Sequence, residues 1–254
     1  MQHPLMLLAL SSTLVTGITS AATVKIVKDI PFSPEDIANA TVINTGIDDA
    51  LGQLGAKAVA HVDLKQDAAY GFSVGISKEK GSFRLGVLTA DLQAALQAGN
   101  REVSQQASAA LLHGLETLNA PAPLLDAAGN LTMLLGSEID LHATERLMSA
   151  LLYPQLMAFI EAQGNASHYS LGQWAEMLSL SIAVKLSDEK ADVAVGLVAR
   201  ASSFTKQLVG KAELPAGVYK ALGELSDLSA TANLGPRELQ QMQTATTTLK
   251  NLLS

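Results

Sequence analysis

Hydrophobic and polar residues alternate strictly over two stretches of the chain, residues 57–88 and 178–200. In the first stretch, every second residue of "DAAYGFSVGIS" is apolar or aromatic, and "LSLSIAVKLS" repeats this pattern in the second. A period of two is typical of half-buried β-strands, and the short polar segments "KQD", "KEKG" and "DEK" have the composition of turns. We therefore predict antiparallel β-hairpins, with a three-stranded meander over 57–88 and a second hairpin over 178–200.

The remaining segments have helical patterns. Helical patterns extend over residues 33–55, 89–118, 137–164, 214–228 and 235–254. Ser33 and Thr89 are candidate N-caps, and Pro236 suits the first position of the last helix. Pro154 is expected to kink or divide the third helical region. Together these patterns predict an α+β fold in which helices cover the apolar face of an antiparallel sheet.

Short words recur in the two halves of the chain. "LGQL" at 51–54 and "LGQW" at 171–174 each precede a predicted hairpin, and "GSF" and "SSF" each follow one. This recurrence suggests an internal duplication, with similar halves at 30–119 and 131–254 joined by the Pro- and Ala-rich segment 119–130. The alternative is that short words recur by chance in a sequence of low diversity.

The first 22 residues read as a signal peptide. Leu5 to Leu10 form a short apolar core, and Ser20-Ala21-Ala22 fits a cleavage site before Thr23. The apolar run is shorter than the roughly 20 residues of a membrane span. No Lys or Arg precedes Lys25, which departs from the usual pattern and keeps a buried N-terminal helix or strand as an alternative. We expect a single domain over 23–254, without a transmembrane span, that is secreted, periplasmic or at the cell surface.

Composition narrows the classes of function. The chain is 48% hydrophobic and carries a net charge of −7, which gives no electrostatic basis for binding nucleic acid. The absence of cysteine excludes a thiol nucleophile and Cys-ligated metals, and neither G-x-x-x-x-G-K-[ST] nor G-x-G-x-x-G occurs, so no cofactor is predicted. Three N-x-[ST] sequons, at Asn39, Asn130 and Asn165, are candidate glycosylation sites in a eukaryotic secretory pathway.

One motif raises an enzymatic hypothesis. Residues 71–75, "GFSVG", match the G-x-S-x-G nucleophile elbow, so Ser73 could attack an ester or amide carbonyl. His142 or His168 would then act as the general base, with Asp126 or Asp140 orienting the imidazole. However, an elbow requires a strand, a sharp turn at the serine and then a helix, whereas the alternating pattern puts Ser73 in the middle of a strand. A secreted serine hydrolase is therefore the alternative function.

A second constellation concerns metal binding. Glu138, His142 and Glu145 are spaced i, i+4, i+7 and would share one face of a helix. Such a trio could contribute to a divalent metal site. There is no H-E-x-x-H motif, and acidic residues after Ser137 are also ordinary in the first turn of a helix. The helix-start interpretation is favoured, and no metal is predicted.

Two predicted strands present small residues on one face, at alternate positions of 69–77 and at Ser179, Ser181 and Ala183. Small faces let another layer approach closely, either an element of the same chain or a partner. With no convincing catalytic constellation, the sequence favours a non-catalytic binding or surface-interaction protein over an enzyme. Its partner would be another protein, a surface, or an apolar small molecule held between sheet and helices.

Overall fold

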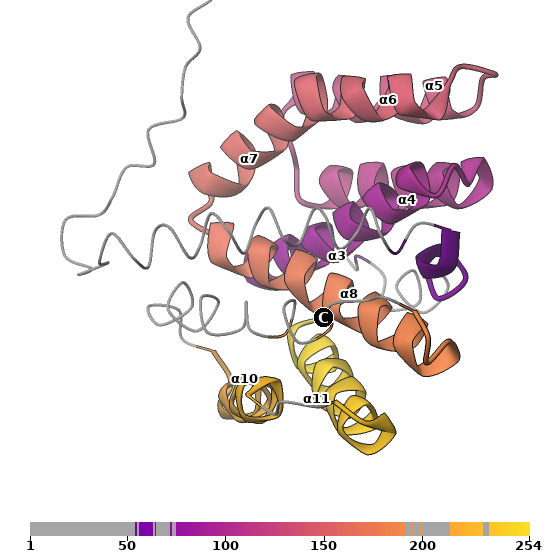
Figure 1. Ribbon diagram of the computed structural model, residues 1–254. Coiled ribbons are helices and arrows are strands. Elements are labelled where there is room, and N and C mark those ends of the chain that lie inside the picture. Colours follow the sequence, from indigo (N-terminus) through magenta and orange to yellow (C-terminus); the bar gives the residue numbers. More distant parts are fainter. Residues whose placement is uncertain are drawn as a thin grey trace, which may run out of the picture.

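The computed structural model describes residues 54, 56–62, 64, 72, 75–191, 195, 199, 214–230 and 234–254. These residues form an all-α bundle that contains no strand (Figure 1). The elements are α3 (Lys78–Gln97), α4 (Arg101–Thr117), α5 (Ala122–Leu135), α6 (Leu141–Leu147), the π-helical turn η1 (Met148–Leu152), α7 (Tyr153–Ala162), α8 (Ala166–Ser187), α10 (Ala216–Ser229) and α11 (Pro236–Leu253).

The predicted α+β fold is therefore wrong. Residues 56–59 are helical, the predicted strand at 82–88 belongs to α3, and the predicted strand at 178–187 belongs to α8. Val195 and Ala199, in the last predicted strand region, are helical as well. Most of the remaining predicted strand, at 67–77, lies outside the described residues.

The reason for the error is clearest in α3, which is buried on all sides. Residues 81–92 are buried without interruption, so the helix has no polar stripe that would reveal its period. Its apolar residues form two rows at helical spacing, one in each core of the bundle. Interleaved along the sequence, the two rows imitate alternation. The rows are Phe83, Val87, Ala90 and Ala94, and Leu85, Leu88, Leu92 and Leu96.

Two buried hydroxyl groups, Ser181 in a predicted strand and Thr89 at a predicted N-cap, are satisfied within their own helices. Ser181 Oγ donates to the Met177 carbonyl at 2.7 Å, and Thr89 Oγ1 donates to the Leu85 carbonyl at 2.7 Å. A polar residue that bonds to the carbonyl four residues earlier can be buried without a partner from another element. The polar positions of the predicted strands were therefore not evidence of a solvent-facing side.

Two glycines bring α3 and α8 unusually close together. A Cβ atom added at Gly86 would lie under 3.0 Å from the Tyr169 carbonyl oxygen, and one added at Gly172 would lie under 3.0 Å from that of Phe83. The atoms in the way are backbone and cannot swing aside. Glycine at both positions lets the helix backbones touch.

The helices are arranged as successive layers around this central pair (Figure 1). On one side of α3 lies α4, followed by α5 with α6, η1 and α7. On the other side α8 packs against α11, which pairs with α10. One hydrophobic core joins α3, α8, α10 and α11, and a second joins α3 to α4, α5, α6, η1 and α7.

The helical predictions fared better than the strand predictions. The predicted helices at 214–228 and 235–254 correspond to α10 and α11. Residues 89–118 are largely helical as predicted, in the end of α3 and in α4, but the N-cap predicted at Thr89 is wrong because α3 begins at Lys78 with Ser77 as its N-cap. The predicted division near Pro154 is also confirmed, because η1 ends where α7 begins, and Pro154 lies in the first turn of α7. A proline cannot donate to the carbonyl four residues earlier, which favours a wider turn there.

Two expectations fall on parts of the chain that this description does not reach. Residues 1–50, with the predicted signal peptide, lie outside the described residues, as does Asn39. The joining segment 119–130 is largely α5, and the duplication itself stays a prediction. Among the described helices, none combines the length and the apolar character that crossing a membrane requires.

Candidate functional site: an apolar groove beside the π-helical turn

The groove lies between α5 and the run α6–η1–α7. Its volume is about 250 Å³, and aliphatic side chains from both walls make up most of its lining. We call this hollow the α5–η1 groove. Its lining residues are Pro123, Asp126, Ala127, Asn130, Leu131 and Leu134 of α5, and Leu147, Met148, Leu151, Leu152 and Gln155 opposite.

The wall opposite α5 has two adjacent rows of apolar residues. Leu141, Met148, Leu152 and Leu156 are buried in the core. Beside them, Leu147 is 40% exposed and Leu151 is 58% exposed. One buried row is enough to dock a helix on a bundle. The second row is therefore not needed to dock this wall on the bundle, and it leaves apolar surface exposed along the groove.

Hydrogen bonds from α4 hold the turn that joins the two walls of the groove. Arg101 of α4 donates to the carbonyls of Leu135, Ser137 and Ile139, so one guanidinium fixes the turn between α5 and α6. Gln105 also donates to the Leu135 carbonyl, at 2.7 Å. These bonds satisfy carbonyls at the end of α5 that have no partner within the helix. The turn that joins the two walls is thus tied to α4.

The groove lies in the acidic part of the molecule. Residues 102–184 contain eight Asp or Glu residues and a single basic residue, Arg146. The whole chain has 24 acidic and 17 basic residues, which leaves 16 of each outside this stretch. In the sequence, 102–184 therefore accounts for the net charge of −7, but Glu176 is buried and paired with Lys250 of α11. Asp126 brings a carboxylate into the groove wall.

A second hollow, of about 530 Å³, lies between α10 and α11. Its lining is mainly charged and amide side chains, with Leu228 the one aliphatic residue among them. Glu224 in this lining also pairs with Lys220 at 3.8 Å. This hollow does not suit an apolar ligand. Its other lining residues are Asp227, Arg237, Gln240, Gln241 and Thr244.

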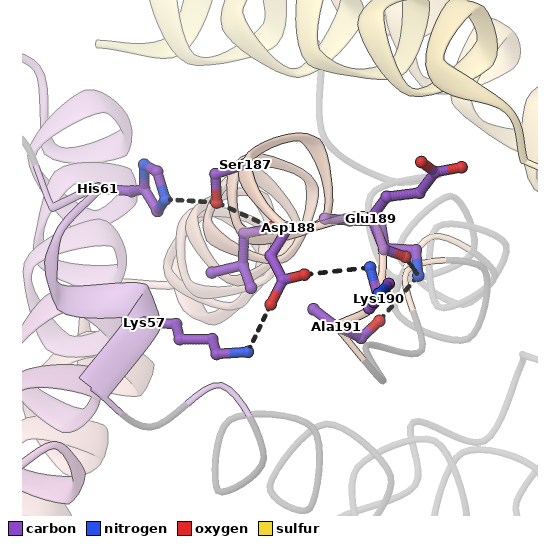
Figure 2. A network of polar contacts seen from close by, with 9 residues as sticks. Lys57, His61, Ser187, Asp188, Glu189, Lys190 and Ala191 are labelled. Atoms are coloured by element: carbon purple, nitrogen blue, oxygen red, sulfur yellow. Dashed lines mark hydrogen bonds and ion pairs between the residues drawn. The ribbon is translucent and has the colours of Figure 1, made fainter.

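A polar network closes the C-terminal end of α8 (Figure 2). Lys57 Nζ contacts Asp188 Oδ2 at 2.8 Å, and His61 Nε2 lies 3.3 Å from Ser187 Oγ. Lys185 donates to the carbonyls of Glu189 and Ala191. The hydrogen bond from Lys57 is the main cause that lowers the pKa of Asp188. Lysines at the end of a helix complement its dipole, so this network is a structural clamp between residues 57–61 and α8.

The structure does not assemble the proposed catalytic set among the residues it describes. Asp140 is the N-cap of α6 and accepts from the backbone N–H groups of His142 and Ala143, so it does not orient an imidazole. The exposed His142 pairs instead with Glu145 at 3.7 Å. Asp126 lies on the exposed side of α5. His168 lies in the first turn of α8.

Ser73 itself lies outside the described residues, but one requirement of a nucleophile elbow, a helix after the serine, can be checked. A helix does follow the motif, because α3 begins at Lys78 with Ser77 as its N-cap. The neighbouring Phe72 packs into the core against α4, and the guanidinium of Arg84 lies 5.9 Å from its ring centre.

The metal-binding trio is not on one helix face. Glu138 lies in the turn before α6, so it is not in helical register with His142 and Glu145. Within the part of the chain that the structure describes, no group of three or more His, Asp or Glu residues is placed to hold a metal ion.

Two of the sequons can be placed. Asn130 is exposed in α5 and lines the groove. Asn165 is buried, at 5% exposure, where α8 begins. A glycan on Asn165 would require the folded chain to open there, whereas a glycan on Asn130 would cover the groove.

Sequence reasoning missed the groove altogether. The signal was present in "ERLMSALLYPQLMAFI", where pairs of adjacent apolar residues recur at Leu147-Met148 and Leu151-Leu152. Such pairs make an apolar stripe wider than one contact face needs. The pattern of the segment by itself predicts only a helix divided by Pro154.

Comparison with protein-family models, with curated protein sequences and with solved structures finds no significant match to this chain. The structural class of the chain is therefore described from its own fold alone. The described residues make an all-α bundle with an apolar surface groove in an acidic half.

Proposed function

We propose that this chain is an exported, non-catalytic binding protein that uses the α5–η1 groove to hold apolar groups of its partner. The observation that carries this proposal is the second apolar row, Leu147 and Leu151, which the fold leaves exposed beside a buried row. A π-helical turn lies in the same wall, and such turns occur often at functional sites.

The size of the groove bears on what it binds. Pockets for small-molecule ligands are usually about 300–1,000 Å³ and enclose most of the ligand. The α5–η1 groove has about 250 Å³ and is open to solvent along its exposed leucines. It therefore suits a few aliphatic side chains of a partner better than a whole lipid, and we favour a protein-binding role over a lipid carrier.

A neutral fluorescent probe tests the groove without involving charge. N-phenylnaphthylamine should brighten and saturate with the full-length protein. Leu147→Ser and Leu151→Ser should weaken its binding about fivefold each, because each removes roughly 1 kcal/mol of apolar contact. Leu186→Ser is the matched control, since Leu186 is also 40% exposed but lies at the far end of α8. Equal binding by all three variants would rule out the groove as the site.

The export part of the proposal rests on the N-terminal sequence alone. Sequencing the mature protein from its own host should give Thr23 as the first residue. Recovery of a chain beginning at Met1 would contradict export through this signal.

Serine hydrolysis at Ser73 remains the second candidate, motivated by the motif and by the helix that follows it at Lys78. A fluorophosphonate probe should leave the protein unlabelled if it is a binding protein. Labelling that disappears in Ser73→Ala would instead establish a nucleophile and replace our proposal.

A further inference from the structure

The shape of the groove indicates the backbone conformation of its occupant. Its walls are helices, whose backbone groups are bonded within each helix, so they offer an extended peptide no strand edge with which to pair. An occupant that is itself helical brings its backbone bonds already formed and needs to supply only side chains. The 14 residues of α5 make a wall about 20 Å long, which matches about four turns of helix.

The charge of the surrounding surface indicates the chemistry of its occupant. The segments that form the groove, residues 122–162, contain five Asp or Glu residues and a single basic residue, Arg146, and Asp126 lies in the groove wall itself. Cationic side chains on a bound helix would therefore be attracted on approach and in the complex, whereas anionic ones would be repelled. Acidic phospholipid would be repelled by the same surface.

We propose that the occupant of the α5–η1 groove is a basic amphipathic helix of a partner protein. This inference rests on the proposed binding function and adds the partner's class. Leucine-like side chains spaced i, i+3, i+4 and i+7 enter the groove beside Leu147 and Leu151. Lysine or arginine side chains on the flanks of that helix lie over the acidic surface.

Synthetic helices of about four turns test this class directly on the full-length protein. One peptide carries Leu on one face and Lys elsewhere. Its twin has Glu in place of every Lys, and a third has the Lys composition with Leu scattered around the helix. We expect fluorescence anisotropy to show one-to-one binding of the first peptide, with the other two at least about tenfold weaker. Added salt should weaken the first peptide's binding.

Matched variants locate the site. Leu147→Ser and Leu151→Ser should each weaken the Lys peptide about tenfold, while Leu186→Ser should leave its affinity unchanged. Both groove leucines are exposed, so the variants should keep the native circular dichroism. Asp126→Asn should reduce affinity about threefold and lower the salt dependence, whereas Asp227→Asn in the α10–α11 hollow should change neither.

Three results would overturn the inference. Equal affinity for the Lys and Glu peptides would refute the basic partner, and the binding function would still stand if the neutral probe enters the groove. Equal weakening by the Leu147 and Leu186 variants would refute the location. A dimer that Leu147→Ser dissolves would show that a second copy of this chain occupies the groove.

Discussion

The close packing of α3 against α8 depends on the absence of a Cβ atom at Gly86 and Gly172. Gly86→Ala or Gly172→Ala would push a methyl group against the backbone of the facing helix. We expect each change to lower the free energy of unfolding by about 1–3 kcal/mol or more, since neither backbone can yield without moving its helix. Urea denaturation measures this loss.

Gly223 provides the matched control. It also lies within a helix, α10, but a Cβ atom added there meets nothing within 4 Å. Gly223→Ala should therefore raise the free energy of unfolding by roughly 0.5–1 kcal/mol, because alanine favours a helix over glycine. If all three variants behaved alike, the close approach of α3 and α8 would be wrong.

His168 makes stability depend on pH. Burial lowers its pKa below the ordinary 6.5, and the nearby Glu79 carboxylate only partly opposes this. The unfolded chain therefore binds a proton near pH 6.5 while the folded chain does not. The free energy of unfolding should fall as pH drops below about 6.5, until the folded histidine protonates too.

His168→Gln removes this dependence and tests it. Urea denaturation at about pH 8 and about pH 5 should show a smaller difference for the variant than for the wild type. His61, His113 and His142 are common to both proteins, so their contributions cancel. An unchanged difference would show that His168 is not desolvated in the folded state.

At the scale of elements, one ion pair fastens α11 to the centre of the bundle. Lys250 of α11 bonds to Glu176 of α8, whose side chain is only 4% exposed. Lys250→Met would leave this carboxylate buried without its lysine, and we expect a loss of about 3 kcal/mol in the free energy of unfolding. Chemical denaturation measures it.

A double variant separates the pair from mere packing. In Lys250→Met with Glu176→Gln, no buried charge is left, so much of the lost stability should return. Glu224→Gln is a useful reference, since the Lys220–Glu224 pair is exposed and should contribute at most about 1 kcal/mol. Additive losses in the double variant would argue that Lys250 and Glu176 do not act together.

The elements that sequence patterns predicted correctly are those with one face in water. Helix α11 has a buried stripe at Leu239, Met242, Leu249 and Leu253 and polar residues elsewhere, so its period is visible in the sequence. Helices α3 and α8 lack that contrast because neighbours surround them. Their helical period becomes apparent only once the two cores are known, which one sequence does not reveal.

The candidate site was hidden for a related reason. Leu147 and Leu151 read as core residues, and only the position of α5 shows that they are left over. Conversely, a candidate catalytic residue of the sequence can have a purely structural role: Asp140 is the N-cap of α6. For the metal-binding trio, the residue types suggested a site, but Glu138 is not in helical register with the other two.

At the scale of the whole molecule, charge and shape divide the bundle in the same way. Residues 122–162, which form the groove, contain five acidic residues and one basic residue, whereas α10 and α11 together contain three of each. A basic partner of the kind proposed would therefore be attracted to the groove side and not to the α10–α11 side.

The close contact of α3 with α8 also has a kinetic consequence. Gly86 and Gly172, which allow it, are 86 positions apart in the sequence, and α4, α5, α6, η1 and α7 all lie in the loop that this contact closes. A helical bundle usually folds fast because its contacts are local, but here the central contact must wait for a long loop to close. The groove helices, whose contacts with one another are closer in sequence, can therefore pack together before α3 and α8 meet, so the groove is expected to form earlier in folding than the centre of the bundle.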